Sequence, residues 1–136
     1  RPAHDAAAAP SAVIPLADGR VGLVTSSSGR RWVVPKGMID PGHTAGEAAL
    51  VEAWEEAGLV GVLDPEPVGS YLYEKYGRTH HVLVYTLRVT EEAVDWPERD
   101  VRKREWVDPP EALDRIDERG LKEIIAAVCP SGVPAG

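Results

Sequence analysis

The distribution of apolar residues along the chain predicts several short strands. Apolar stretches rich in Val, Leu and Tyr are separated by turn residues such as Asp18-Gly19, which is the pattern of strands joined by tight connections. The expected strands cover residues 12–16, 20–26, 32–34, 60–63, 68–74, 80–90 and 104–107. Residues 36–43, which contain glycines and a proline, and the charged residues 91–103 are expected to form loops.

The expected helices are marked by signals at their ends. Thr44, followed three residues later by Glu47, is a capping-box pattern that predicts a helix start. Gly58 is a residue type that often follows the last helical turn, so this helix is expected to end near Ala57. Residues 110–118 and 120–128 are expected to form two short helices. This order of elements predicts an α/β (α+β) fold in which a mixed β-sheet is sandwiched between helices.

The length of 136 residues suits one domain. We expect residues 1–10 to be a flexible lead, residues 11–129 to form the domain and residues 130–136 to be a flexible tail. No apolar run approaches the roughly 20 residues that a membrane-spanning helix needs, so no membrane association is expected.

Charge and cysteine content narrow the classes of partner. Acidic residues outnumber basic ones by 22 to 15, and the net charge is −7. Because attraction to phosphates dominates nucleic-acid binding, a nucleic-acid partner is not expected. Cys129 is the only cysteine, which excludes an intrachain disulfide and a cysteine-based zinc site. A lone cysteine fits a reducing compartment, so a cytoplasmic location is expected.

The central expected helix carries three glutamates on one face. With 100° of rotation per residue, Glu52, Glu55 and Glu56 fall within an arc of about 100°. The residues on the other side, which are expected to be buried, are Leu50, Ala53, Trp54 and Ala57. Like charges at this spacing destabilise a helix by about 0.2–0.5 kcal/mol per pair, and the helix dipole disfavours anions in the last turn.

Two explanations account for this crowding of charge. The ordinary one is a solvated acidic face, and the other is a bound divalent cation that converts repulsion into coordination. The small Ala48 and Ala49 beside the glutamates leave room for a cation, and the preceding glycine-containing loop allows carbonyl groups to approach. Oxygen ligands favour Mg²⁺ or Mn²⁺ over zinc.

Residues 37–59 resemble the Nudix box, whose pattern is G-x5-E-x7-R-E-U-x-E-E-x-G-U, with U aliphatic. The positions that match the charged and glycine residues of this pattern, together with its last aliphatic residue, are Gly37, Glu52, Glu55, Glu56, Gly58 and Leu59. His43 stands in place of the first glutamate and Val51 in place of the arginine. The preceding residues 32–37 are also similar to the strand that leads into this box.

This resemblance implies a Nudix fold and a hydrolase that acts on phosphorus-containing acid anhydrides with the help of a metal ion. By position, Glu52 and Glu56 would ligate Mg²⁺, and the Lys36 carbonyl would be a further ligand. Glu55 would ligate a second ion or act as the base, so that Glu52 and Glu55 are the residues expected to take part in catalysis. The number of ions and the oligomeric state are left open by the sequence.

Other residues resemble particular branches of this family. Residues 23–28, Trp96 and residues 102–106 are similar to the diphosphoinositol polyphosphate phosphohydrolases, whereas Pro35-Lys36-Gly37 looks more like the bacterial dinucleoside polyphosphate hydrolases. We therefore expect a small-molecule polyphosphate substrate of one of these two kinds. The alternatives are a nucleoside-diphosphate-X compound, such as ADP-ribose or a damaged nucleotide, and a non-catalytic module that senses nucleotides. The residues that this resemblance assigns to substrate contact are Ser28, Arg30, Lys36, His81, Arg102 and Arg104.

The two departures from the box pattern remove opposite charges. In the family pattern the missing glutamate and arginine help to hold the loop and the helix together. Because both are replaced here, by His43 and Val51, neither replacement leaves a charged partner behind. We therefore hypothesise that catalysis is retained while the loop is less rigid; the competing hypothesis is an attenuated enzyme.

Overall fold

The computed structural model describes residues 10–129. The expected flexible tail over residues 130–136, and the expected lead up to residue 9, lie outside the described residues. Pro10, which we expected to end the lead, is instead the first residue of a strand. The elements are β1 (Pro10–Ala17), β2 (Arg20–Thr25), β3 (Trp32–Val33), β4 (Lys36–Met38), α2 (Ala45–Ala57), β5 (Leu59–Leu63), β6 (Gly69–Lys75), β7 (Arg78–Glu92), β8 (Arg104–Val107), α3 (Pro109–Arg115) and α4 (Arg119–Val128).

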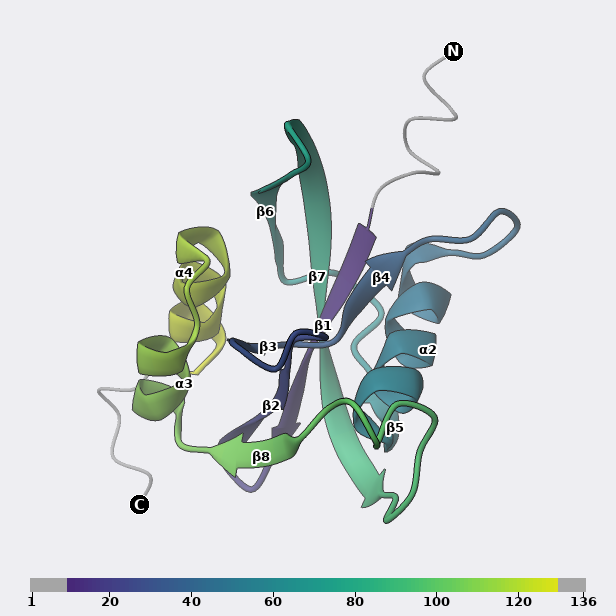
Figure 1. The fold of residues 1–136 in the computed structure, drawn as a ribbon, viewed down its shortest axis with the longest axis vertical. Helices are drawn as coiled ribbons and strands as arrows, with labels where there is room; N and C mark the ends of the chain where they lie inside the picture. The colour runs from purple at the N-terminus through teal and green to yellow at the C-terminus, as the bar shows by residue number, and fades with distance from the viewer. Residues whose placement is uncertain (1–9, 130–136) are drawn as a thin grey trace.

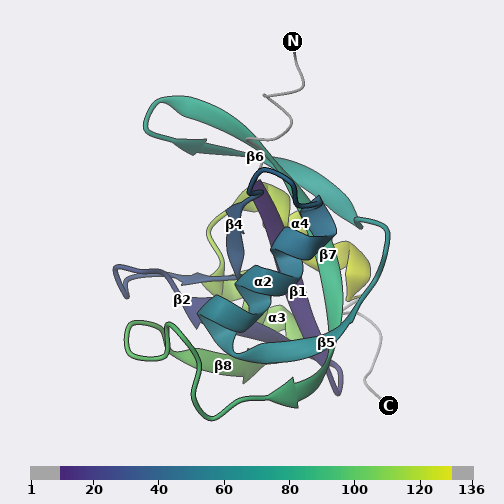
Figure 2. The ribbon, with the colours of Figure 1, turned by 90° about the vertical axis from the view of Figure 1, so that its right-hand side faces the viewer.

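One mixed sheet forms the centre of the fold. Its main path runs β3-β2-β1-β7-β5, and β4, β6 and β8 pair with β1, β7 and β2 respectively. The β1–β7 pair is parallel, whereas all the other pairs are antiparallel. Helix α2 covers one side of the sheet, and α3 and α4 cover the other (Figures 1 and 2). The expected fold, a mixed sheet between helices, is confirmed.

The alternation of side chains along β1 feeds two separate cores. Ala12 and Ile14 pack with apolar residues of α3 and α4 in one cluster. Val13, between them in sequence, packs with Ala49 and Ala53 of α2 in the other. Because neighbouring side chains on a strand point to opposite faces, β1 is buried on both sides. The strand is therefore a fixed support for whatever lies along its edges.

The expected loop over residues 36–43 is wrong for its first three residues. Lys36–Met38 form β4, which pairs with the start of β1 through the register Ser11↔Gly37. The partner residues lie far away in sequence, so local turn signals such as Gly37 hide this pairing. The consequence is that residues 36–38 have a strand backbone, whereas residues 39–44, which lead into α2, remain irregular.

The bounds of the remaining elements lie within a few residues of those expected from the sequence. β8 and the C-terminal end of α2 fall at the expected residues, and two helices follow β8 as expected. The largest differences are that α3 ends at Arg115, earlier than expected, that β7 extends to Arg78 and Glu92, and that β1 starts at Pro10. No helix within residues 10–129 is both long enough and apolar enough to cross a membrane.

Candidate active site

Helix α2 begins and ends where its sequence signals predict. The Glu47 N–H donates to Thr44 Oγ1 at 3.0 Å, and the Thr44 N–H donates to Glu47 Oε1 at 2.8 Å. At the other end Gly58 has a φ of 67°, in the left-handed region where a side chain is unfavourable. These two ends fix the position of every glutamate along the helix.

The buried face of α2 agrees with the expected one at Ala53 and Ala57 and differs from it elsewhere. Leu50 and Trp54, expected to be buried, are 40% and 39% exposed. The buried residues are Ala48, Ala49, Ala53, Glu56 and Ala57. Small side chains let the helix lie close to the sheet, so the alanine stripe, rather than the larger apolar residues, sets the packed face. Glu56 is consequently turned towards the protein rather than towards solvent.

Glu52 and Glu56 lie against the backbone of β4. The Lys36 N–H donates to Glu56 Oε1 at 3.3 Å. A Cβ at position 37 would lie 2.3 Å from Glu52 Cδ, so Glu52 occupies space that only a glycine leaves free. Two elements that are separate in sequence therefore form a cradle for a pair of carboxyl groups.

Both carboxyl groups of this pair have a raised pKa. Burial, followed by the neighbouring Glu56 carboxyl, raises the pKa of Glu52 to about 8. Burial also raises the pKa of Glu56, against the opposing effect of the Arg102 guanidinium. Two carboxyl groups this close resist carrying two negative charges together, so the pair favours binding either a proton or a cation.

The pair fits a divalent cation that takes its other ligands from elsewhere. In the part of the chain that the structure describes, no three His, Cys, Asp or Glu side chains converge as a complete metal-binding set. Mg²⁺ commonly uses one or two carboxylates and completes its shell with waters and substrate oxygens. The Glu52–Glu56 pair is held in a backbone cradle and offers carboxylate oxygens beside one another, which meets that requirement.

Glu55 is next to this pair but has a different environment. Its side chain is exposed, and its charge contributes to the raised pKa of Glu52. Its backbone carbonyl accepts a hydrogen bond from the Glu98 N–H at 3.0 Å. The structure therefore brings Glu55 near the pair from the solvent side.

Arg102 is directly beside Glu56. Its Nη2 lies 3.5 Å from Glu56 Oε2, its Nε donates to Glu98 Oε1 at 2.6 Å, and its Nη1 donates to the Thr25 carbonyl at 2.9 Å. The sequence interpretation missed Glu98 and Thr25. The spacing of four residues between Glu98 and Arg102 was the available signal for their ion pair, although it does not point to Glu56.

Two other residues assigned to substrate contact have their charged groups held elsewhere. Lys36 Nζ lies 3.3 Å from the centroid of the Tyr73 ring and 4.0 Å from Glu118 Oε2, on the α4 side of the sheet. Arg104 donates to the Ala57 carbonyl at 2.7 Å, at the C-terminal end of α2. The structure therefore does not bring these two cationic groups to the glutamate pair.

The other three residues assigned to substrate contact lie at the surface. Ser28 and Arg30 are exposed in the connection between β2 and β3, where Ser28 Oγ lies 3.1 Å from Ser26 Oγ. His81 is on β7, with Nε2 2.7 Å from Ser70 Oγ. Within residues 10–129, none of the three is hydrogen-bonded to Glu52 or Glu56. Their contact with a substrate stays a prediction.

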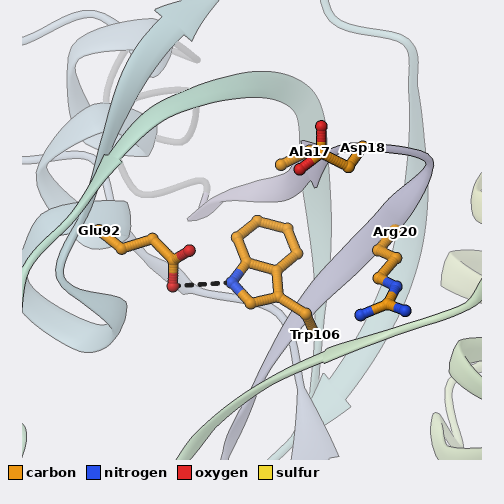
Figure 3. A pocket seen from close by; sticks show the side chains of 5 residues that line it. All are labelled: Ala17, Asp18, Arg20, Glu92 and Trp106. Carbon is orange, nitrogen blue, oxygen red and sulfur yellow. Dashed lines mark hydrogen bonds between the residues drawn. The ribbon is translucent and has the colours of Figure 1, made fainter.

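The protein also has a cavity at the sheet whose lining does not include the glutamate pair. It has a volume of about 340 Å³ and is lined by Ala17, Asp18, Arg20, Glu92 and Trp106 (Figure 3). The indole N–H of Trp106 donates to Glu92 Oε1 at 2.9 Å across it. None of the residues predicted to bind metal or substrate lines this cavity.

Comparison with known proteins gives a family match over most of the chain. A family model described as "NUDIX domain" matches residues 7–128. Nudix hydrolase 4 of Arabidopsis thaliana is 33% identical over 107 residues, covering 77% of this chain and 51% of that protein. Diphosphoinositol polyphosphate phosphohydrolase 2 of Mus musculus is 39% identical over 87 residues, covering 61% of this chain and 46% of that protein. The chain spans about half the length of the curated relatives it matches.

A solved structure shares the fold. A binary complex of a C. elegans Ap4A hydrolase superposes with a TM-score of 0.74 at 18% identity, covering 93% of this chain and 99% of that chain. At this identity the likeness supports the architecture of sheet and helices alone.

Proposed function

Because the chain belongs to the Nudix family, we propose that it is a metal-dependent hydrolase that cleaves a phosphoanhydride bond in a small-molecule polyphosphate. The observation that carries this proposal is the Glu52–Glu56 pair, held by the Lys36 N–H and by the space above Gly37. A structural role alone does not account for two neighbouring carboxyl groups whose pKa values are both raised by burial, and of which Glu56 raises the pKa of Glu52 further.

We propose Mg²⁺ as the ion, with Mn²⁺ as an effective substitute. Glu52 and Glu56 would hold it, together with the Lys36 carbonyl, and Glu55 would hold a second ion or accept the proton of the attacking water. When bound, the ion would neutralise charge on the phosphoryl group and promote attack by water. The exposed position of Glu55 supports its assigned role, because a base must be accessible to water.

The proposed substrate is a diphosphoinositol polyphosphate or a dinucleoside polyphosphate. The name of the mouse relative supports the first class, and the resemblance of Pro35-Lys36-Gly37 to the bacterial dinucleoside polyphosphate hydrolases supports the second. The proposed contacts to its phosphates are Ser28, Arg30 and His81, because all three side chains are polar and exposed. His81 is also hydrogen-bonded to Ser70. Arginine suits such contacts because its planar group can donate two parallel hydrogen bonds to one phosphate. A net charge of −7 supports a small-molecule partner rather than a nucleic acid.

The proposed location is the cytoplasm, on the basis of a single cysteine. Some relatives carry mitochondrial or chloroplastic in their names. Fractionation of the source cells, followed by immunodetection, tests this assignment.

The function is tested by phosphate or nucleotide release from a panel of substrates in Mg²⁺. The panel contains a diphosphoinositol polyphosphate, dinucleoside polyphosphates, ADP-ribose and an oxidised nucleoside triphosphate. We expect turnover of one of the first two classes, and a loss of at least about a hundredfold in Glu56→Gln, because a proposed ligand is removed. Glu123→Gln, on the exposed side of α4, is the matched control and is expected to keep wild-type activity.

Each other outcome has a defined meaning. Preferential turnover of ADP-ribose or of the oxidised nucleotide would assign the protein to the nucleoside-diphosphate-X class. If both the wild-type protein and Glu56→Gln bind a nucleotide and neither hydrolyses it, the protein is a sensor. Equal turnover by the wild-type protein and Glu56→Gln would remove Glu56 from the proposed site.

A further inference from the structure

The segment between β7 and β8 closes the C-terminal end of α2. The last four carbonyl groups of a helix have no partner within the helix, and α2 has no basic residue in its last turn. Three successive carbonyls receive donors from residues 96–104, which we call the capping segment. The bonds run from the Glu98 N–H to Glu55 O (3.0 Å), from Trp96 Nε1 to Glu56 O (3.0 Å) and from Arg104 Nη1 to Ala57 O (2.7 Å). Figure 1 shows this segment, in green, passing the lower end of α2.

The capping segment is also fixed to the sheet. The Thr25 N–H donates to the Lys103 carbonyl at 3.0 Å, and the Lys103 N–H donates to Thr25 Oγ1 at 2.9 Å. Within the segment, the Arg102 N–H donates to the Glu98 carbonyl at 3.0 Å. Its backbone is therefore held both by the end of β2 and by the end of α2.

The side chain of Arg102, in this segment, contacts Glu56 of the glutamate pair. Each of its three guanidinium nitrogens has a partner, and the partners come from three different segments: Glu98, Thr25 and Glu56. The side chain of Arg102 is 12% exposed and that of Glu56 is 9% exposed. A planar guanidinium with several fixed acceptors has little freedom to move, so it restrains the carboxylate that it touches.

Each of the two oxygens of Glu56 is consequently restrained by a different partner. Oε2 lies near Arg102 Nη2, and Oε1 accepts the hydrogen bond from the Lys36 N–H. These contacts fix the plane of the carboxylate relative to Glu52 and Gly37.

We propose that Arg102 is a positioning residue for Glu56, holding its carboxylate in the orientation that a divalent cation requires, rather than a contact for the substrate. This inference rests on the proposed function, in which Glu56 is a metal ligand. The structure supports it because the guanidinium is engaged with protein groups and is nearly inaccessible, whereas a phosphate contact needs exposed N–H groups.

The diagnostic variant is Arg102→Lys. It keeps a positive charge near Glu56 but removes the planar fork, so it cannot bond Glu98, Thr25 and Glu56 together. The matched control is Arg99→Lys in the same segment, because Arg99 pairs with Asp95 at 3.8 Å and its side chain is 53% exposed. Thermal unfolding of all variants confirms that they are folded at the assay temperature.

The first measurement is the affinity for Mn²⁺ alone, by titration calorimetry without substrate. We expect Arg102→Lys to weaken Mn²⁺ binding by about fivefold or more, and Arg99→Lys to leave it unchanged. Adding Arg102→Lys to Glu56→Gln is expected to cause no further weakening, because the arginine acts through Glu56. Wild-type Mn²⁺ affinity in Arg102→Lys would overturn the inference.

The second measurement separates kcat from KM at saturating Mg²⁺. A positioning role predicts that kcat falls about tenfold while KM for the substrate stays within about threefold. A rise in KM of about tenfold at unchanged kcat would instead make Arg102 a substrate contact and overturn the inference.

The two proposals fail in distinguishable ways. If the wild-type protein binds Mn²⁺ and Arg102→Lys weakens this binding, the positioning role stands even if no substrate in the panel is hydrolysed. If the wild-type protein hydrolyses a substrate and Arg102→Lys matches it in Mn²⁺ affinity and kcat, the function stands and the positioning role fails. A wild-type protein that neither binds Mn²⁺ nor hydrolyses a substrate contradicts both.

Discussion

At the scale of single residues, the site is defined by charges placed where they oppose one another. Glu52 and Glu56 are one helical turn apart and share a cradle formed by Lys36 and Gly37. Burial removes the water that would otherwise screen them, so the pKa of Glu52 rises to about 8. Ionisation of this pair therefore lowers the stability of the folded protein, as is common where a protein binds a charged ligand.

The variant Glu52→Gln tests whether ionisation of Glu52 destabilises the folded protein. A carboxyl whose pKa is higher in the folded state binds its proton more tightly there than when unfolded. The metal-free wild-type protein should therefore lose stability as pH rises from about 4.5 to about 8, the ordinary and raised pKa values of Glu52. We expect Glu52→Gln to show a smaller loss over this range, and to have a higher Tm at pH 8 but no activity.

Thermal unfolding in a chelating buffer at several pH values is the measurement, with Glu123→Gln as the control for loss of one exposed carboxylate. A lower Tm for Glu52→Gln than for the wild-type protein at pH 8 would contradict this account of the pair.

At the scale of elements, α2 and the segment that precedes it meet at a small hollow. The hollow has a volume of about 30 Å³, and His43, Val51 and Glu52 are among the residues that line it. His43 and Val51 are the two residues that depart from the Nudix box, and the structure places them at the same hollow. Each is exposed, so neither replacement buries an unpaired charge.

The double variant His43→Glu with Val51→Arg tests whether this hollow limits the enzyme. The new side chains face one hollow and are expected to form an ion pair, which raises Tm slightly, since exposed pairs contribute about 0–1 kcal/mol. We expect turnover to change by less than about tenfold, because Glu52 and Glu56 are unchanged. Steady-state kinetics on the panel and thermal unfolding are the measurements. An increase in turnover of about tenfold or more would instead support the attenuated-enzyme hypothesis.

At the scale of the whole molecule, the sheet lies between α2, which carries the glutamate pair, and the two helices α3 and α4. Helix α2 packs against one face, and α3 and α4 pack against the other. On that second face Gly120 lies so close to β6 that a Cβ would be 2.5 Å from Tyr71 Cβ. The Lys36 side chain also reaches this face, although its backbone supports Glu56 on the other.

Gly120→Ala should therefore separate stability from catalysis. The added methyl group meets the base of a buried side chain rather than a flexible tip, so α4 must shift; overpacking of this kind costs about 1–3 kcal/mol. We expect a lower free energy of unfolding in urea and an unchanged kcat well below the Tm. A loss of kcat in a protein that is still fully folded would show that the two layers are coupled through the sheet.

The sequence by itself determined the features that depend on residues a few positions apart. The ends of α2 follow from Thr44, Glu47 and Gly58, and the spacing of the glutamates follows from the helix that these ends define. The resemblance to the Nudix box rests on the same local spacing, and the family match confirms it.

Only the tertiary structure decided how the glutamates are oriented and what holds them. The alanine stripe rather than Leu50 and Trp54 became the buried face, because helical angles alone do not say which side meets the sheet. The contacts that hold Glu56 depend on residues far apart in sequence. The hydrogen bond from Lys36 to Glu56 spans 20 positions, and the one from Arg102, which contacts Glu56, to Thr25 spans 77. Such contacts depend on where the sheet places each segment, and no periodicity in the chain encodes that placement.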